Sequence, residues 1–177
     1  MKTLYTLAYP VLSRSDAQWI AALRGRHDPQ AGIVEAHFTM VFACSAVAED
    51  AYLAHVEALA GVSPPVRFTC RYAMLAADDQ GARAYVYLVP DEGYSGLSRL
   101  HDGLYTGPLA ERLRLDIPFV PHVTLGSTAD RRAAKRLCDE LNERGVAVDG
   151  RVDALTVAAL EEGRLRDLAR FALAGPP

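Results

Sequence analysis

Alternating apolar and polar positions predict a chain that is rich in β-strands. Runs with many β-branched and aromatic residues indicate strands at residues 3–12, 33–43, 66–75, 82–89 and 119–127. The third and fourth runs flank residues 76–81, which suit the loop of a hairpin. Residues 146–173 add at least two more strands with a turn near Glu162 and Gly163, and residues 175–177 are expected to be a frayed tail.

Apolar residues at helical spacing predict helices between these strands. The predicted helices are residues 15–25, 49–60, 97–105 with an extension at 109–115, and 130–145. Ser15 opens a capping box, and Asp130 is a good N-cap. Helices and strands mix without strict alternation, so an α+β fold is expected. No low-complexity linker divides the chain, and residues 1–177 are expected to form a single domain.

Each half of the chain carries the same short motif inside a predicted strand. The two stretches are Ala36-His37-Phe38-Thr39-Met40-Val41-Phe42 and Pro121-His122-Val123-Thr124-Leu125-Gly126, and both read His-x-Thr. Side chains two positions apart in a strand share a face, so each histidine lies beside its threonine. The opposite faces are apolar and suit packing under helices, with Phe38, Met40 and Phe42 in the first stretch and Val123 and Leu125 in the second.

The two motifs resemble the signature of the 2H phosphoesterase superfamily, which includes bacterial 2′-5′ RNA ligase-like proteins and cyclic nucleotide phosphodiesterases. Residues 100–109 and 116–122 also resemble bacterial members. The resemblance implies a two-lobed, pseudo-symmetric fold with antiparallel sheets around a central cleft and one motif per lobe. It further implies that His37, Thr39, His122 and Thr124 line that cleft. Many RNA ligase-like members carry a basic residue three positions after the second threonine, where this chain has Ser127, so its substrate need not be the same.

Phosphodiester chemistry gives this residue set an independent rationale. Opening a 2′,3′-cyclic phosphate needs a base for water and an acid for the departing ribose oxygen, and histidine suits both because its pKa is near neutral. The hydroxyls of Thr39 and Thr124 can donate to the phosphate oxygens. We therefore expect His37 and His122 to be catalytic, with no metal and no cofactor, on RNA ends or small nucleotides, and a related 2′-5′ RNA ligation is a variant. Which histidine is the acid stays open.

Composition limits the partners and the compartment. The net charge is −3, which does not suit a clamp for long duplex nucleic acid, although residues 99–136 carry a balance of +3. No apolar run approaches the ~18 residues of a membrane span, and no signal peptide is recognisable. The three cysteines are widely spaced and suit reduced, buried thiols. A monomeric, cytoplasmic protein without membrane contact is expected.

Two other function classes remain open from the sequence. One is a non-catalytic module that binds nucleotides or RNA ends in the same cleft. The other is a divalent-metal hydrolase that uses the two histidines as ligands, which the lack of Asp or Glu beside either motif disfavours. Structural roles are expected for His27, His55 and His101. For Tyr85 and Tyr87, packing within the sheet is favoured over stacking on a base. The basic cluster is expected to form a solvated helix face: Arg131, Arg132, Lys135 and Arg136.

Overall fold

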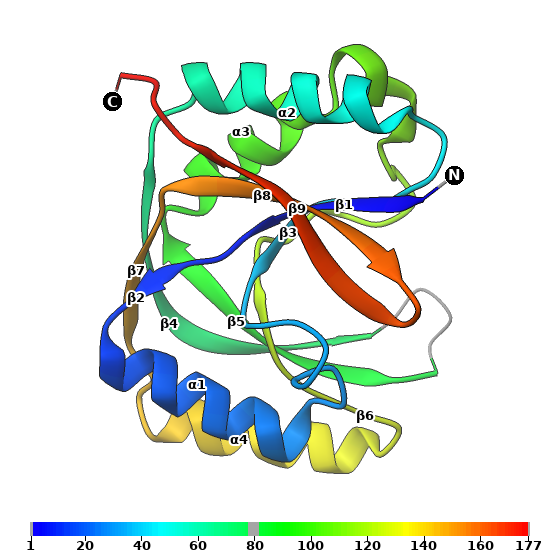
Figure 1. Cartoon of the computed structure of the whole chain (residues 1–177). Helices are drawn as coiled ribbons and strands as arrows, with labels where there is room; N and C mark the ends of the chain where they lie inside the picture. Colours follow the sequence, from blue (N-terminus) through cyan, green and yellow to red (C-terminus); the bar gives the residue numbers. More distant parts are fainter. Residues whose placement is uncertain (1, 78–81, 177) are drawn as a thin grey trace.

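The computed structural model of the chain describes residues 2–77 and 82–176 (Figure 1). Its strands are β1 (Thr3–Ala8), β2 (Val11–Leu12), β3 (Phe38–Cys44), β4 (Val66–Ala77), β5 (Ala84–Glu92), β6 (Val123–Thr128), β7 (Val148–Val152), β8 (Ala154–Glu161) and β9 (Arg164–Ala172). Its helices are α1 (Arg14–His27), α2 (Glu49–Val62), α3 (Tyr94–Leu104) and α4 (Arg131–Glu143), with a 3₁₀ helix η1 (Gly107–Arg112). The tip of the predicted hairpin, at residues 78–81, lies outside the described residues.

Two antiparallel sheets form two lobes. One sheet has the order β3-β1-β8-β9 and the other has the order β2-β7-β4-β5-β6. Helix α2 packs on β8 and β9 and α3 packs on β3, while α1 packs on β6 and α4 on β4, β5 and β6. The helices therefore lie at opposite ends of the molecule with the sheets between them (Figure 1). The predicted α+β fold of two lobes is confirmed.

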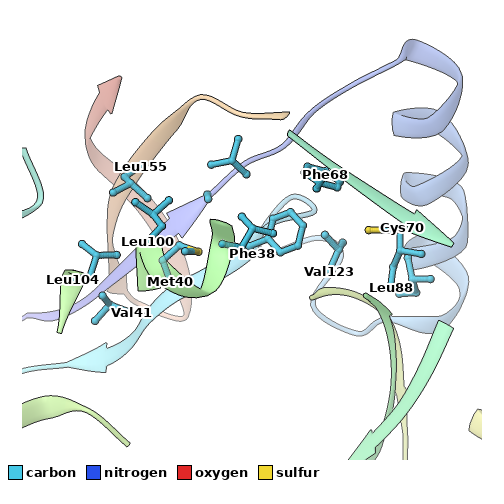
Figure 2. Packing of buried hydrophobic residues seen from close by; sticks show 14 of the residues in the cluster. Phe38, Met40, Val41, Phe68, Cys70, Leu88, Leu100, Leu104, Val123 and Leu155 are labelled. Carbon is cyan, nitrogen blue, oxygen red and sulfur yellow. The ribbon is translucent and has the colours of Figure 1, made fainter. Parts of the chain in front are cut away.

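The motif strands β3 and β6 are edge strands, one in each sheet. Both contribute to one buried apolar cluster that contains residues of both lobes. Within this cluster the rings of Phe38 on β3 and Phe68 on β4 make an edge-to-face contact with centroids 5.1 Å apart. Figure 2 shows Phe38 close to Val123 of β6. The shared cluster thus fixes the two motif strands relative to each other.

The predicted strand at residues 3–12 is divided between the lobes. Residues Thr3–Ala8 form β1 of the first sheet, whereas Val11 and Leu12 pair with Arg151 and Gly150 of β7 in the second sheet. Pro10 separates the two pieces, and proline has no amide hydrogen with which to continue a ladder. One apolar run in the sequence therefore serves both lobes.

Other predicted boundaries also shift. The N-cap of α1 is Ser13, whose Oγ accepts a hydrogen bond from the Asp16 amide at 3.1 Å, and the helix continues past Gly25 to His27. The prediction of a frayed tail at residues 175–177 is wrong at its first residue, because the Gly175 amide donates to the Ser63 carbonyl at 2.9 Å. The Ala174 amide before it donates to the Ala60 carbonyl at 3.1 Å. In residues 2–77 and 82–176 the longest helices have 14 residues, and none could span a membrane.

Candidate active site

Both motif histidines stand immediately before their strands rather than inside them. β3 begins at Phe38 and β6 at Val123, so the predicted strands at residues 33–43 and 119–127 start too early. Before β3 the chain forms turns, in which the Ala31 amide donates to the Asp28 carbonyl at 3.0 Å. Each ring is half-buried. A histidine at the entry of an edge strand can be held by its own backbone while it stays open to a ligand.

The same backbone contact holds the two rings. Nδ1 of His37 lies 2.7 Å from the Glu35 carbonyl oxygen, and Nδ1 of His122 lies 2.6 Å from that of Val120. A carbonyl oxygen only accepts hydrogen bonds, so Nδ1 carries the proton in both rings. Each neutral imidazole therefore presents Nε2, with its lone pair, as the nitrogen available for chemistry.

A β-bulge follows Thr39 in the first motif strand. The ladder with β1 shifts register there, so that Met40 is passed over and Val41 takes the place opposite Thr6. Val41 is consequently fully buried, whereas Phe42 is 37% exposed. The prediction that Phe42 shares the buried face is wrong for this reason, while that for Phe38 and Met40 is confirmed.

The second motif strand has a bulge at the equivalent position. Thr124 lies opposite Tyr87 of β5, but the next pair is Gly126 with Val86, so that Leu125 is passed over. Leu125 corresponds to Met40, since each follows its histidine by three positions. The two motifs therefore share backbone irregularities as well as residue types.

The threonines lie on the faces of the sheets that the helices leave uncovered. Thr39 lies opposite Leu7 of β1. The preceding residue of β1, Thr6, points to the opposite face, where its hydroxyl bonds the Tyr52 hydroxyl of α2 at 2.8 Å. On β6, Gly126 lies on the face that α4 covers, because a Cβ added there would lie 3.3 Å from Leu137 of α4. The bulge between Thr124 and Gly126 turns Thr124 to the opposite face, where it lies opposite Tyr87 of β5. Both threonines are half-buried and lie on the sheet faces opposite those that the helices cover.

Aromatic rings flank both histidines. Tyr87 stacks on His122 with centroids 3.6 Å apart and planes at 17°, and Tyr85 lies 5.7 Å from Tyr87. Tyr9 meets His37 edge-on with centroids 6.2 Å apart, and its hydroxyl donates to Asp167 at 3.3 Å. The sequence offered no signal for either partnership, because Tyr9, between β1 and β2, and Tyr87, on β5, are far from the motifs in the chain.

The family follows from comparison with known proteins. Residues 12–164 match a sequence model described as the 2′-5′ RNA ligase superfamily. The chain belongs to this superfamily. The resemblance to 2H phosphoesterases inferred from the two motifs is thereby confirmed, and with it a relationship to a superfamily of phosphoesterases. A comparison with curated protein sequences gives no significant match.

Three solved structures are similar in fold to this chain. E. coli LigT complexed with 3′-AMP is 23% identical, with 97% of this chain and 98% of that chain covered and a TM-score of 0.59. A crystal structure of a phosphoesterase is 22% identical over 98% and 99% of the two chains, with a TM-score of 0.59. Kluyveromyces marxianus Usb1 is 12% identical over 94% and 97%, with a TM-score of 0.53. These identities show the fold alone.

Burial lowers the pKa of both histidines in this superfamily member. The pKa of His122 is lowered from 6.5 to about 4, mainly by burial and to a smaller extent by the positive charge of a protonated His37. The pKa of His37 is also lowered, first by burial and then by the positive charge of Arg24. The residues that follow the two histidines, Phe38 and Val123, lie close together in the shared apolar cluster (Figure 2), so a charge on His37 can act on His122.

A buried ion pair lies next to His37. Nη2 and Nε of Arg24 donate to one carboxylate oxygen of Asp28 at 2.8 and 3.0 Å, and the other oxygen accepts from the Gln30 amide at 3.0 Å. The two charges act oppositely on His37, because Arg24 lowers its pKa and Asp28 raises it. This pair was not predicted from the sequence, although an i, i+4 Arg–Asp spacing at a helix end is a recognisable signal.

The remaining histidines have structural surroundings, as predicted. His101 is buried, stacks on Phe119 with centroids 3.6 Å apart, and bonds Asp102 through Nδ1 at 2.9 Å. His55 is half-buried, and its Nε2 lies 2.8 Å from the Leu104 carbonyl oxygen. The exposed basic face of α4 and the buried, unbridged cysteines are also confirmed: Arg131, Arg132, Lys135, Arg136, Cys44, Cys70 and Cys138.

Ser127, which stands where many members of the superfamily carry a basic residue, has a cation beside it from another strand. Nε of Arg83 donates to the Ser127 hydroxyl at 2.7 Å, and Nη2 donates to the Ser127 carbonyl at 2.9 Å. Arg83 lies just before β5, next to β6 in the sheet. In the described part of the chain, no three His, Cys, Asp or Glu side chains gather as potential metal ligands.

Proposed function

We propose that this protein is a metal-independent phosphodiesterase that hydrolyses 2′,3′-cyclic phosphates of RNA ends or small nucleotides. The observation that carries the proposal is the equivalence of His37 and His122. Both are half-buried, both are fixed through Nδ1 by a carbonyl two residues earlier, and both present Nε2 from neighbouring edge strands. Two such imidazoles, each beside a threonine, can hold one phosphate between them.

The reaction requires one proton transfer from water to a base and one from an acid to the departing ribose oxygen. Nε2 of one neutral histidine removes a proton from water as the water oxygen forms a bond to phosphorus. The bond from phosphorus to one ribose oxygen breaks, and the other histidine, protonated at Nε2, gives its proton to that oxygen. The Thr39 and Thr124 hydroxyls donate to the non-bridging oxygens, where negative charge is stabilised. If the 5′-hydroxyl of a second RNA replaces water, the same site performs 2′-5′ ligation.

The effect of one histidine on the other favours one assignment of roles. A protonated His37 lowers the pKa of His122, so we assign the proton of a singly protonated pair to His37. His122 is then neutral and acts as the base, and His37 acts as the acid. A bound phosphate adds negative charge beside both rings and raises both pKa values towards neutrality.

The ligands bound by a protein of similar fold support a small nucleotide as the substrate of this chain. E. coli LigT has been crystallised in complexes with 3′-AMP, NADP+, ATP and phosphate. These ligands share phosphate groups, and most also carry adenosine. A site that accepts a nucleotide phosphate in the same fold is what the proposed reaction of this chain requires.

Turnover of 2′,3′-cyclic nucleotides in excess EDTA tests the proposal directly. We expect adenosine 2′,3′-cyclic phosphate and an oligonucleotide with a cyclic end to yield a monoester, followed by chromatography, with EDTA causing no loss. Binding without turnover would favour the nucleotide-binding module instead. Activity that EDTA abolishes and a divalent metal restores would favour the metal hydrolase.

The pH profile of kcat/KM is expected to be bell-shaped with its maximum below pH 6.5. Below about pH 4 His122 is protonated and cannot act as the base, because its pKa is about 4. Above the lowered pKa of His37 both are neutral and no acid remains. Initial rates from pH 3.5 to 9 at constant ionic strength measure both limbs, with circular dichroism confirming the fold. A rate that rises to a plateau above pH 7 would contradict the assignment.

A further inference from the structure

We propose that Arg83 binds a second phosphate of the substrate, next to the reacting one. The protein would then prefer RNA ends of two or more nucleotides over a mononucleoside cyclic phosphate. The inference rests on the proposed function, since it places this phosphate relative to His122 and Thr124. It deepens that function by naming the class of substrate that the site is built to accept.

The guanidinium of Arg83 is held in place from one side. Nε and Nη2 donate to the hydroxyl and carbonyl oxygens of Ser127 at 2.7 and 2.9 Å. Two hydrogen bonds to a single residue fix the plane of the guanidinium, and the side chain is half-buried. Nη1 makes no hydrogen bond with any described residue and remains available to a ligand. A fixed, planar cation of this kind suits phosphate recognition.

Arg83 shares a sheet face with the candidate catalytic residues. Ser127 lies opposite Tyr85, and Thr124 lies opposite Tyr87, whose ring stacks on His122. Tyr85 and Tyr87 are two positions apart on β5, which is roughly 7 Å along a strand. The guanidinium over Ser127 is therefore displaced from the Thr124 hydroxyl by about the length of one nucleotide unit, with the Tyr85 ring beside it.

Among the described residues Arg83 has only uncharged partners, whereas Arg71 and Arg170, both in strands, pair with carboxylates. Arg71 pairs with Asp91 and Glu92 at 2.8 and 2.6 Å, and Arg170 pairs with Asp153 at 2.9 Å. No carboxylate among residues 2–77 and 82–176 forms an ion pair with Arg83, whose two partners are uncharged oxygens of Ser127. A half-buried cation with uncharged partners retains its full attraction for an anion.

The experiment compares three substrates with wild type and Arg83→Gln. The substrates are a mononucleoside 2′,3′-cyclic phosphate, a dinucleotide with a cyclic end, and the same dinucleotide with an uncharged methylphosphonate linkage. We expect Arg83→Gln to lower kcat/KM for the charged dinucleotide by about 10- to 100-fold, from the loss of charge-assisted hydrogen bonds. It should leave the mononucleoside substrate unchanged. The methylphosphonate should lower the wild-type value equally and be insensitive to the substitution.

Matched variants separate binding from folding. Arg83→Lys should keep part of the preference for the charged dinucleotide, and Arg164→Gln, at an exposed position on β9, should change nothing. Equal losses on all three substrates, or none, would overturn the proposal, since the first outcome indicates a structural role and the second no role. Thermal melting of each variant verifies that the fold is intact.

A binding measurement keeps this inference separable from the catalytic one. If wild type turns over no substrate, the proposed hydrolysis fails, and calorimetry then compares a dinucleotide 3′-phosphate with a nucleoside 3′-phosphate. Weaker binding of the dinucleotide alone by Arg83→Gln supports the second phosphate site without catalysis. Unchanged binding of both ligands overturns it.

Discussion

Replacing either His37 or His122 by alanine is expected to lower kcat for 2′,3′-cyclic phosphate hydrolysis by about 10²- to 10⁴-fold. Each variant removes one of the two proton transfers, because the opposing histidine cannot act as base and acid in a single step. The double variant should be about as slow as either single variant, since the two groups act as a unit. Single-turnover and steady-state rates in EDTA measure these losses.

His27→Ala is a matched control, because His27 is exposed at the end of α1 and is not part of the motif pair. Its turnover should equal that of wild type. Added imidazole should partly restore the alanine variants at position 37 or 122, an effect that a purely structural histidine would not show. Equal rates for wild type, His37→Ala and His122→Ala would rule out the proposed catalysis.

Local pattern was enough to locate the motif strands, but not to locate where they begin. Apolar residues around His37 extend the alternating pattern back to Ile33, yet hydrogen bonding to β1 begins only at Phe38. The ring of His37 needs the Glu35 carbonyl, and a carbonyl that accepts from a side chain two residues on belongs to a turn. Periodicity reports burial of side chains and does not report how backbone carbonyls are used.

The bulges show a second limit of periodicity. A rule of strict alternation places Phe42 in the core, and it fails because Met40 and Val41 are both fully buried, one after the other. The sequence carries no marker for this bulge. Its recurrence at Leu125 becomes visible only when the two ladders are compared. The pairing of motif halves was predictable from His-x-Thr, whereas their common backbone geometry was not.

Long-range contacts formed the part of the site that the sequence could not supply. Tyr87 reaches His122 because β5 pairs with β6, and Arg83 reaches Ser127 for the same reason. The strand order could not be deduced from an α+β element list, since several orders suit the same elements. Only the residues inside each motif could be chosen from sequence, and their partners required the sheet.

Asp28→Ala is expected to destabilise the protein by about 3–5 kcal/mol, because it leaves the charge of Arg24 buried without its partner. The two side chains are only 6% and 2% exposed, so water cannot replace the lost carboxylate. Urea unfolding followed by circular dichroism measures the change. The double variant Arg24→Met, Asp28→Leu should recover most of the stability, since it removes the charge together with its partner. A single variant as stable as wild type would contradict the burial argument.

The gentler variant Asp28→Asn links this pair to the chemistry of His37. Asp28 raises the pKa of His37 and Arg24 lowers it, so removing only the negative charge lowers that pKa further. In the proposed mechanism the alkaline limb of kcat/KM belongs to His37, and it should move to lower pH while the acid limb of His122 stays in place. A shift of the acid limb instead would reverse the roles of the two histidines. An unchanged profile would mean that neither limb reports His37.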